Sequence, residues 1–376
     1  MRVTVVGGGM ITHDQILPSL CQLQRLGRVS EIAVAAQHGR TLRALAAAFP
    51  SNRFQAWPEL TADPEVAHPD LYRQAIGALP PRNLVVVALP DHLHFEAVMT
   101  ALKHDQHVIV VKPLVLKVAE AETIEREARR RRLFVGIEYH KRFDDRSLLA
   151  RSKYRAGAFG EFRLGTACLM EKWYYRHSNF QNWCTDAFTY IGCHYVDLVH
   201  FITGLLPVAV SVYGIQDRYP NGNEGFLWTD ARVLWNNGAC LNVQNSLSFP
   251  DAAPGTNTQG LTLYCSANGR GGLLRHSDQY RGLEYVYADQ PAYAEPSPDY
   301  LQHTEFGVSG YGYRSIEFLL ACANRVEQST DRLQTLAEID SEAIAATPAN
   351  SRYNEQIIEA ARQSIQNNGN LVHCQA

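Results

Sequence analysis

The chain has 376 residues, of which 46% are hydrophobic and 19% are charged, and its formal net charge is −3. This length predicts two globular domains, and the nearly balanced charge excludes a large basic surface for nucleic acid or membranes. The eight cysteines are scattered without a C-x-x-C pair, which is typical of reduced thiols. We therefore expect a cytoplasmic protein with no structural zinc site, signal peptide or membrane span.

The first 138 residues alternate between strand-like and helix-like segments. The β-branched run Val3–Val6 stops at three glycines, and apolar residues then recur at helical spacing from Ile16 to Leu26. Further apolar strands are expected at 31–35, 83–90, 107–111 and 133–138, with helices between them. This alternation predicts a doubly wound α/β domain over residues 1–138.

The opening strand, glycine turn and helix favour dinucleotide binding. Gly7 permits the turn, Gly9 lets the backbone approach a pyrophosphate, and the helix start offers N–H donors. Thr12 stands where the third glycine of G-x-G-x-x-G would be. The second strand ends without the acid that usually holds the ribose of NAD. His38 and Arg40 suit a 2′-phosphate of NADP, although Arg40 can equally be solvated.

Lys112 ends a central strand of this domain and is followed by Pro113. Open α/β sheets bind their ligands at the carboxyl ends of strands, which favours a site role for this lysine. The competing interpretation is a surface lysine, since most lysines are exposed.

Strands dominate the chain after residue 143. They are expected from residue 160 onward and at 208–213, 226–235, 239–248, 261–265 and 271–276, with helices at 144–156, 313–326 and 354–367. This order predicts an α+β domain over residues 139–376 with a large, mostly antiparallel open sheet. Such a sheet needs a cover, so we expect a homodimer or homotetramer formed through it.

The segment Phe188–Asp197 contains three groups that can handle protons. Tyr190, His194 and Asp197 are four and three residues apart, which places them along one face of a helix. An imidazole beside a phenol and a carboxylate is suited to acid–base catalysis at neutral pH. Spacings of three drift across a helix face, so we expect no metal at His194, Asp197 and His200.

Several segments together resemble a known family. Ala88-Leu89-Pro90 with His94 resembles a T-P-x-x-x-H segment, and 107–114 resembles H-V-x-x-E-K-P-L. Arg142-Phe143 resembles an R-F pair that opens the second domain, and 190–197 resembles D-x-G-x-H-x-x-D. With the N-terminal glycine turn, these ordered segments are similar to the Gfo/Idh/MocA family of NAD(P)-dependent sugar oxidoreductases.

The resemblance implies roles for individual residues. Lys112 would contact the substrate hydroxyl and the nicotinamide ribose, and His194 would carry the proton. Val111 replaces the family's Glu, and Tyr190 replaces its usual Asp. A lysine beside the phenol would lower its pKa, so either Tyr190 or His194 can be the acid or base.

The expected site residues fall into three sets. The catalytic set is Lys112, Tyr190 and His194. The cofactor set, for NAD or NADP, is Gly7, Gly9, Met10, Ile11, Gln37, His38, Arg40, Leu89, Pro90, His94 and Lys112. The substrate set is His140, Lys141, Arg142, Tyr174, Arg176, Asn182 and Asp197, whose three cations would also suit an acidic sugar.

These residues predict hydride transfer between nicotinamide and a ring carbon of a sugar, cyclitol or glycoside. The alternative is an NAD-dependent glycoside hydrolase that works by transient oxidation, elimination, water addition and re-reduction. A sugar sensor without catalysis is a third interpretation, which the presence of Lys112 and His194 disfavours.

Overall fold

The computed structural model describes residues 1–253, 257–277, 300–305 and 307–374. The chain forms two compact units. Unit 1 comprises Met1–His140 and Leu301–Ser351, and unit 2 comprises Lys141–Tyr300 and Arg352–Ala376. Residues 301–351 thus pack with the N-terminal part, whereas the sequence assigned them to the second domain. The cause is helix α8 (Tyr311–Gln328), whose Leu319 lies against Gly136 in the sheet of unit 1.

Unit 1 contains a six-stranded parallel sheet with the order β3-β2-β1-β4-β5-β6. This confirms the predicted doubly wound fold. The short edge strand β3 was missed, because its three residues lie in a polar, proline-rich stretch. The strands are β1 (Val3–Val6), β2 (Ile32–Ala35), β3 (Gln55–Trp57), β4 (Leu84–Val87), β5 (His107–Val111) and β6 (Val135–Glu138).

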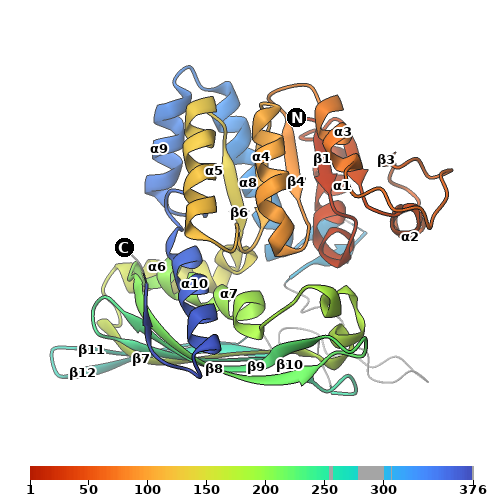
Figure 1. The fold of residues 1–376 in the computed structure, drawn as a ribbon. Helices are drawn as coiled ribbons and strands as arrows, with labels where there is room; N and C mark the ends of the chain where they lie inside the picture. The colour runs from red at the N-terminus through yellow and green to blue at the C-terminus, as the bar shows by residue number, and fades with distance from the viewer. Residues whose placement is uncertain (254–256, 278–299, 306, 375–376) are drawn as a thin grey trace. The chain divides into compact units, whose positions relative to one another are not determined.

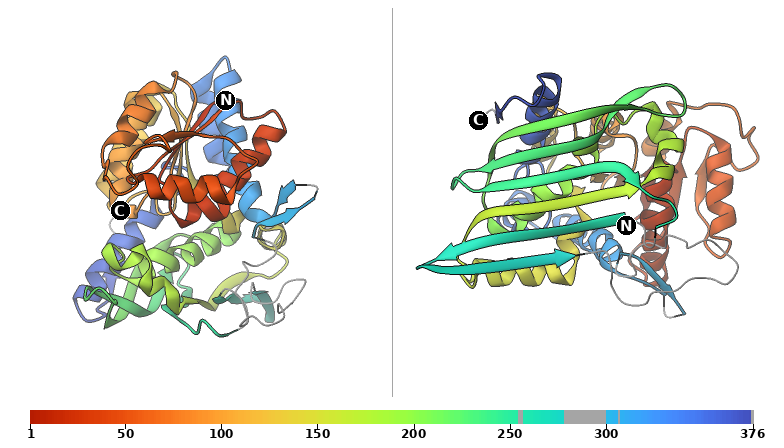
Figure 2. Two further views of the ribbon diagram at one scale, coloured as in Figure 1. Left: turned by 90° about the vertical axis from the view of Figure 1, so that its right-hand side faces the viewer. Right: turned by 90° about the horizontal axis from the view of Figure 1, so that it is seen from below.

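Helices cover both faces of this sheet (Figures 1 and 2). On one face α4 packs between α3 and α5, and on the other α1 packs against α8, which also contacts β5 and β6. No helix among the described residues is long and apolar enough to span a membrane. The remaining helices of unit 1 are α1 (Leu17–Arg25), α2 (Gly39–Ala48), α3 (Leu71–Ala78), α4 (His94–Lys103), α5 (Val118–Arg131) and α9 (Arg332–Glu342).

His107 connects the beginning of β5 to α8 through a hydrogen bond. Its ring is fully buried, and Nδ1 accepts a hydrogen bond from the Phe134 backbone N–H at 3.0 Å. The proton therefore lies on Nε2, which donates to Glu327 Oε2 at 3.2 Å. Burial lowers the pKa of His107 to about 4, so the ring is neutral in the folded protein.

We expect His107 to make the fold less stable in acid. As pH falls from 6.5 to about 4, the unfolded chain binds a proton that the folded chain does not. The free energy of unfolding should therefore fall by up to about 3 kcal/mol. His107→Asn retains an acceptor for Phe134 but cannot titrate. Urea unfolding from pH 7 to 4 should give a flatter profile for this variant, and parallel profiles would contradict the assignment.

Unit 2 is built on a seven-stranded sheet with the order β12-β11-β7-β10-β9-β8-β15. β10 pairs with β7 in parallel and the other neighbours are antiparallel, which confirms the predicted mostly antiparallel sheet. The strands are β7 (Glu161–Lys172), β8 (Pro207–Arg218), β9 (Glu224–Trp235), β10 (Cys240–Phe249), β11 (Asn257–Ala267), β12 (Arg270–Ser277) and β15 (Val372–His373). A separate pair, β13 (Gln302–Thr304) and β14 (Gly307–Ser309), belongs to unit 1.

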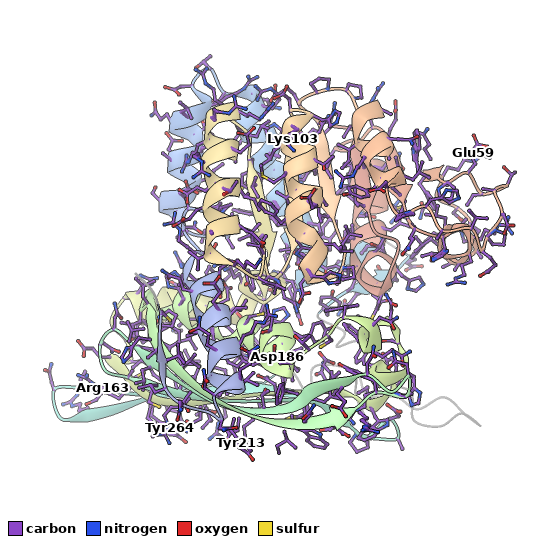
Figure 3. The ribbon with its side chains drawn as sticks, in the orientation of Figure 1. Glu59, Lys103, Arg163, Asp186, Tyr213 and Tyr264 are labelled. Carbon is purple, nitrogen blue, oxygen red and sulfur yellow. The ribbon has the colours of Figure 1, made fainter. Side chains whose placement is uncertain are left out.

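The helices of unit 2 lie over one face of its sheet. They are α6 (Asp145–Arg155), α7 (Cys193–Thr203) and α10 (Tyr353–Gln366). No described helix of this unit covers the opposite face, which Figure 2 (right) shows directly. Tyr213 and Tyr264 point away from the helices there and are 60% and 48% exposed (Figure 3). Unit 2 therefore presents an open sheet with large apolar side chains.

Candidate functional site

The glycine turn after β1 has a backbone that other residues would disrupt. Gly7 has φ of +109°, and an added Cβ would lie 2.1 Å from the carbonyl oxygen of Ala88. Thr12, which replaces the third glycine, is buried and donates its hydroxyl proton to the Gly7 carbonyl at 2.7 Å. Thr12, which departs from the glycine pattern, thus stabilises the turn through this hydrogen bond.

The next residues of the turn face outward, as a dinucleotide requires. An added Cβ on Gly9 would meet no atom within 4 Å, so there is space beside this backbone. Met10 is exposed and Ile11 is partly exposed, immediately before the helical segment Thr12–Ile16. Backbone N–H groups at a helix start bind phosphate. The turn therefore fits the pyrophosphate of NAD or NADP.

At the end of β2, Arg40 and Glu65 form an exposed ion pair. Glu65 follows β3 in sequence, and its loop is fastened to the start of α2 because Arg40 N donates to the Pro64 carbonyl at 3.3 Å. Gln37 is exposed and His38 is partly buried beside them. This edge carries both a guanidinium suited to a 2′-phosphate and a carboxylate suited to ribose hydroxyls. The sequence alone indicates the guanidinium but not the carboxylate.

His94 joins the ends of two strands. Its ring is completely buried, with Nε2 2.8 Å from the Leu89 carbonyl oxygen and Nδ1 2.8 Å from that of Pro113. Burial lowers the pKa of this imidazole. The neutral ring has one N–H and donates it to one of these carbonyls. Its complete burial between backbone groups favours a supporting role over the expected contact with cofactor.

Lys112 follows β5 at the carboxyl edge of the sheet, in a partly buried position. The peptide bond to Pro113 is cis. Leu89 and Pro90 occupy the same edge after β4, and both are partly exposed. The turn after β1 and the ends of β4 and β5 therefore bring most of the expected cofactor set to one edge of unit 1.

In unit 2, the segment with the three proton-handling groups is not one regular helix. Phe188–Gly192 is a π-helical turn, and α7 begins only at Cys193. The regular helix predicted from the sequence is therefore interrupted between Tyr190 and His194. Tyr190 and Asp197 have different neighbours, and the single face predicted from the sequence is divided.

Tyr190 packs in an aromatic cluster. Its ring centroid lies 4.6 Å from that of Phe180 and 5.9 Å from that of Trp183. Burial, together with the nearby charge of Glu171, raises the pKa of Tyr190 well above its ordinary value. The shift is opposite to the lowering of the Tyr190 pKa by a lysine that was predicted from the sequence. The phenol instead keeps its proton at neutral pH and is suited to donating a hydrogen bond.

Asp197 is the centre of a buried network. Arg142 donates to its two carboxylate oxygens at 2.8 and 2.6 Å, and both side chains are only 2% exposed. Tyr353 and Asn354 of α10 add hydrogen bonds to Oδ1 at 2.9 and 3.1 Å. Two members of the expected substrate set therefore bind each other, and the geometry favours a structural role for both.

The remaining members of the substrate set have varied surroundings. Lys141 is buried and its Nζ donates to Gln259 Oε1. Arg176 is 2% exposed, donates to Asp217 Oδ2 at 2.5 Å and stacks on Trp173 with its guanidinium carbon 3.8 Å from the ring centroid. Tyr174 and Asn182 are exposed.

His140 alone of this set lies in unit 1, where its Nδ1 is 3.2 Å from Glu138 Oε2. The contacts that the sequence does not predict join residues that are far apart along the chain. Tyr353 lies 156 residues from Asp197, and Glu65 lies 25 residues from Arg40. Their local sequences carry no motif, so only the folded chain reveals them.

Comparisons with known proteins agree with this architecture. Two curated relatives are a dTDP-3,4-didehydro-2,6-dideoxy-α-D-glucose 3-reductase of Saccharopolyspora spinosa and a scyllo-inositol 2-dehydrogenase (NADP(+)) of Bacillus subtilis. The first is 25% identical over 167 residues, 44% of this chain and 45% of the relative. The second is 30% identical over 83 residues, 22% of each chain. The chain matches less than half the length of the curated relatives.

A solved structure has the same fold over the whole chain. GenD2 from gentamicin A biosynthesis, in complex with NAD, superposes with a TM-score of 0.71 at 17% identity, covering 100% of this chain and 97% of that chain. The model of the Gfo/Idh/MocA oxidoreductase family, NAD-binding Rossmann fold, matches residues 1–139. Residues 1–139 thus match the NAD-binding Rossmann domain of the Gfo/Idh/MocA oxidoreductase family.

Proposed function

We propose that the chain is an NAD(P)-dependent oxidoreductase that transfers a hydride between nicotinamide and a ring carbon of a sugar or cyclitol. The observation that carries this proposal is the edge of unit 1, where the glycine turn and Lys112 follow strands of the same parallel sheet. The activities of the two curated relatives, one on a deoxysugar and one on an inositol, support this class of substrate.

The proposed roles follow from the chemistry of each group. A bound nicotinamide dinucleotide supplies the hydride acceptor. Lys112 polarises the substrate oxygen, and His194 accepts the hydroxyl proton during oxidation and returns it during reduction. Tyr190 stays protonated because burial raises its pKa, so it donates a hydrogen bond and does not act as the base.

We further propose that the substrate is neutral. The three cations that suggested an acidic sugar are Lys141, Arg142 and Arg176. Arg142 and Arg176 are paired with buried or partly buried carboxylates, and Lys141 binds an amide oxygen. Breaking a buried ion pair to bind a carboxylate of the substrate would cost several kcal/mol. The hydroxyl groups of a neutral substrate can bind without breaking these ion pairs.

A panel of sugars, cyclitols and glycosides tests this function. The purified protein is incubated with each compound and with NAD⁺ or NADP⁺, while absorbance at 340 nm and release of the aglycone are followed. Net formation of NADH or NADPH on a neutral polyol is expected. Aglycone release without a net absorbance change would identify redox-neutral glycoside cleavage instead. Tight binding of cofactor and sugar without turnover would identify a sensor.

Choice of cofactor should depend on the ion pair at the end of β2. Glu65→Gln removes the carboxylate that neutralises Arg40, which leaves the guanidinium for a 2′-phosphate. We expect NADPH to bind about tenfold more tightly relative to NADH in this variant, on the scale of one charged hydrogen bond. Titration by NADH and NADPH fluorescence measures the ratio. Glu59→Gln in the same segment is the control, and an equal ratio in both variants would exclude Glu65 as the determinant.

We also propose that unit 2 forms a homodimer or homotetramer through the open face of its sheet. Large side chains are exposed there on alternate residues of the strands, including Leu164, Ile215 and Leu273, each about half exposed. Contiguous apolar surface of this kind marks an interface. A self-complementary contact between identical sheets would cover it.

A further inference from the structure

Glu138 is a buried carboxylate that the proposed mechanism does not use. It ends β6 and is 1% exposed. Its Oε1 accepts hydrogen bonds from Gln15 Nε2 at 2.9 Å and from Ser315 Oγ at 2.6 Å. Burial opposes its charge, but the contacts with His140, Ser315 and Gln15 outweigh burial and lower its pKa. Glu138 is therefore ionised at neutral pH and held in one orientation.

The second oxygen of this carboxylate determines the form of His140. Oε2 lies 3.2 Å from His140 Nδ1, and an ionised carboxylate only accepts hydrogen bonds. Nδ1 must therefore carry a proton, which leaves the lone pair of the neutral ring on Nε2. The ring also stacks on Tyr311, with centroids 5.8 Å apart, which restrains its rotation. The imidazole is thus fixed in both tautomer and orientation.

Glu138 and His140 lie at the carboxyl edge of the unit 1 sheet, as Lys112 does. β5 and β6 are adjacent parallel strands, and Glu138 is the register partner of Val111. Lys112 and His140 follow these paired positions by one and two residues. Val111 stands where the resemblance expects a carboxylate, and Glu138 provides one on the neighbouring strand. A carboxylate that fixes the tautomer and orientation of an imidazole is a common arrangement in active sites.

We propose that Glu138 is a positioning residue that holds His140 in the Nδ1-protonated form, so that Nε2 binds the substrate hydroxyl beside Lys112. This inference rests on the proposed oxidoreductase function. His140 is then the group that contacts substrate, and Glu138 acts only through it. The arrangement uses residues of unit 1 alone.

A double-mutant cycle combined with nitrogen-15 NMR of the histidines tests the proposal. In Glu138→Gln the ring should lose its fixed tautomer, and kcat should fall by about tenfold or more while NADH affinity stays within twofold. His140→Gln should lower kcat by about a hundredfold. Glu138→Gln should cause no further loss of kcat in the His140→Gln background, because both substitutions disrupt the same Glu138–His140 pair.

Ser315→Ala is the matched control. It removes one hydrogen bond from the same carboxylate and leaves the contact with His140 in place. It should reduce thermal stability as much as Glu138→Gln does, yet retain the tautomer and kcat. Additive losses in the double mutant, or an unchanged tautomer in Glu138→Gln, would overturn the proposal. The tautomer is read without substrate, so a failure of the oxidoreductase assignment alone would leave that result intact.

Discussion

Replacing Lys112 with methionine should lower kcat by about a hundredfold to a thousandfold, because a cation at the substrate oxygen stabilises charge that develops during hydride transfer. Methionine has a similar length without the charge, so packing beside β5 should be retained. NADH affinity, measured by fluorescence, should change little compared with kcat. Stopped-flow absorbance at 340 nm on the best polyol substrate measures the loss.

Lys117→Met is the matched control for this substitution. Lys117 lies in the same connection between β5 and α5, but its side chain is 66% exposed and pairs with the surface residue Glu120. It should retain full turnover. Equal kcat values for Lys112→Met and the wild type would remove the residue from the proposed mechanism, whereas a loss in NADH affinity alone would restrict it to cofactor binding.

Asp197→Ala should destabilise the protein by about 3–5 kcal/mol. The substitution leaves the Arg142 guanidinium buried without the carboxylate that receives two of its hydrogen bonds, and an uncompensated buried charge is costly. Tyr353 and Asn354 lose an acceptor as well. Urea unfolding followed by circular dichroism gives the difference in the free energy of unfolding.

An exposed ion pair provides the comparison. Arg325 and Glu338 are both more than 40% exposed, so Glu338→Ala should change stability by about 0.5 kcal/mol or less. If Asp197→Ala changes the free energy of unfolding by an equally small amount, the buried network does not stabilise the fold. The role of Asp197 in substrate binding would then have to be reconsidered.

Most of the fold was predictable because its signals are local. Short apolar runs rich in β-branched residues, such as Leu84–Val87, are typical of strands covered on both faces, and alternation along β9 separates its two faces. The predictions failed where local signals are weak. β3 has three residues, α9 has four apolar residues among its eleven, and the membership of α8 in unit 1 depends on packing at long range.

The site was predictable to a lesser degree, for a related reason. Gly7 follows a strand and has the positive φ angle that a glycine there suggests. Lys112 also follows a strand, where ligands bind. Both signals are local and can be recognised in the sequence. The π-helical turn before α7 cannot be recognised in this way, since no residue pattern in Phe188–Gly192 distinguishes it from an α-helix. Arg142 and Arg176 look like ligand-binding cations until their carboxylate partners, which lie 55 and 41 residues away, are placed beside them.

The division of the chain into interleaved segments constrains its biosynthesis. Glu138 leaves the ribosome well before Ser315, which lies 177 residues later and satisfies the same carboxylate. At about 5–20 residues per second, this interval is about 10–35 seconds. During that time the nascent nucleotide-binding sheet lacks α8, so the buried faces of β5 and β6 are uncovered. A chaperone that recognises apolar β-strands should therefore engage the nascent chain within this window and leave once residue 328 has emerged.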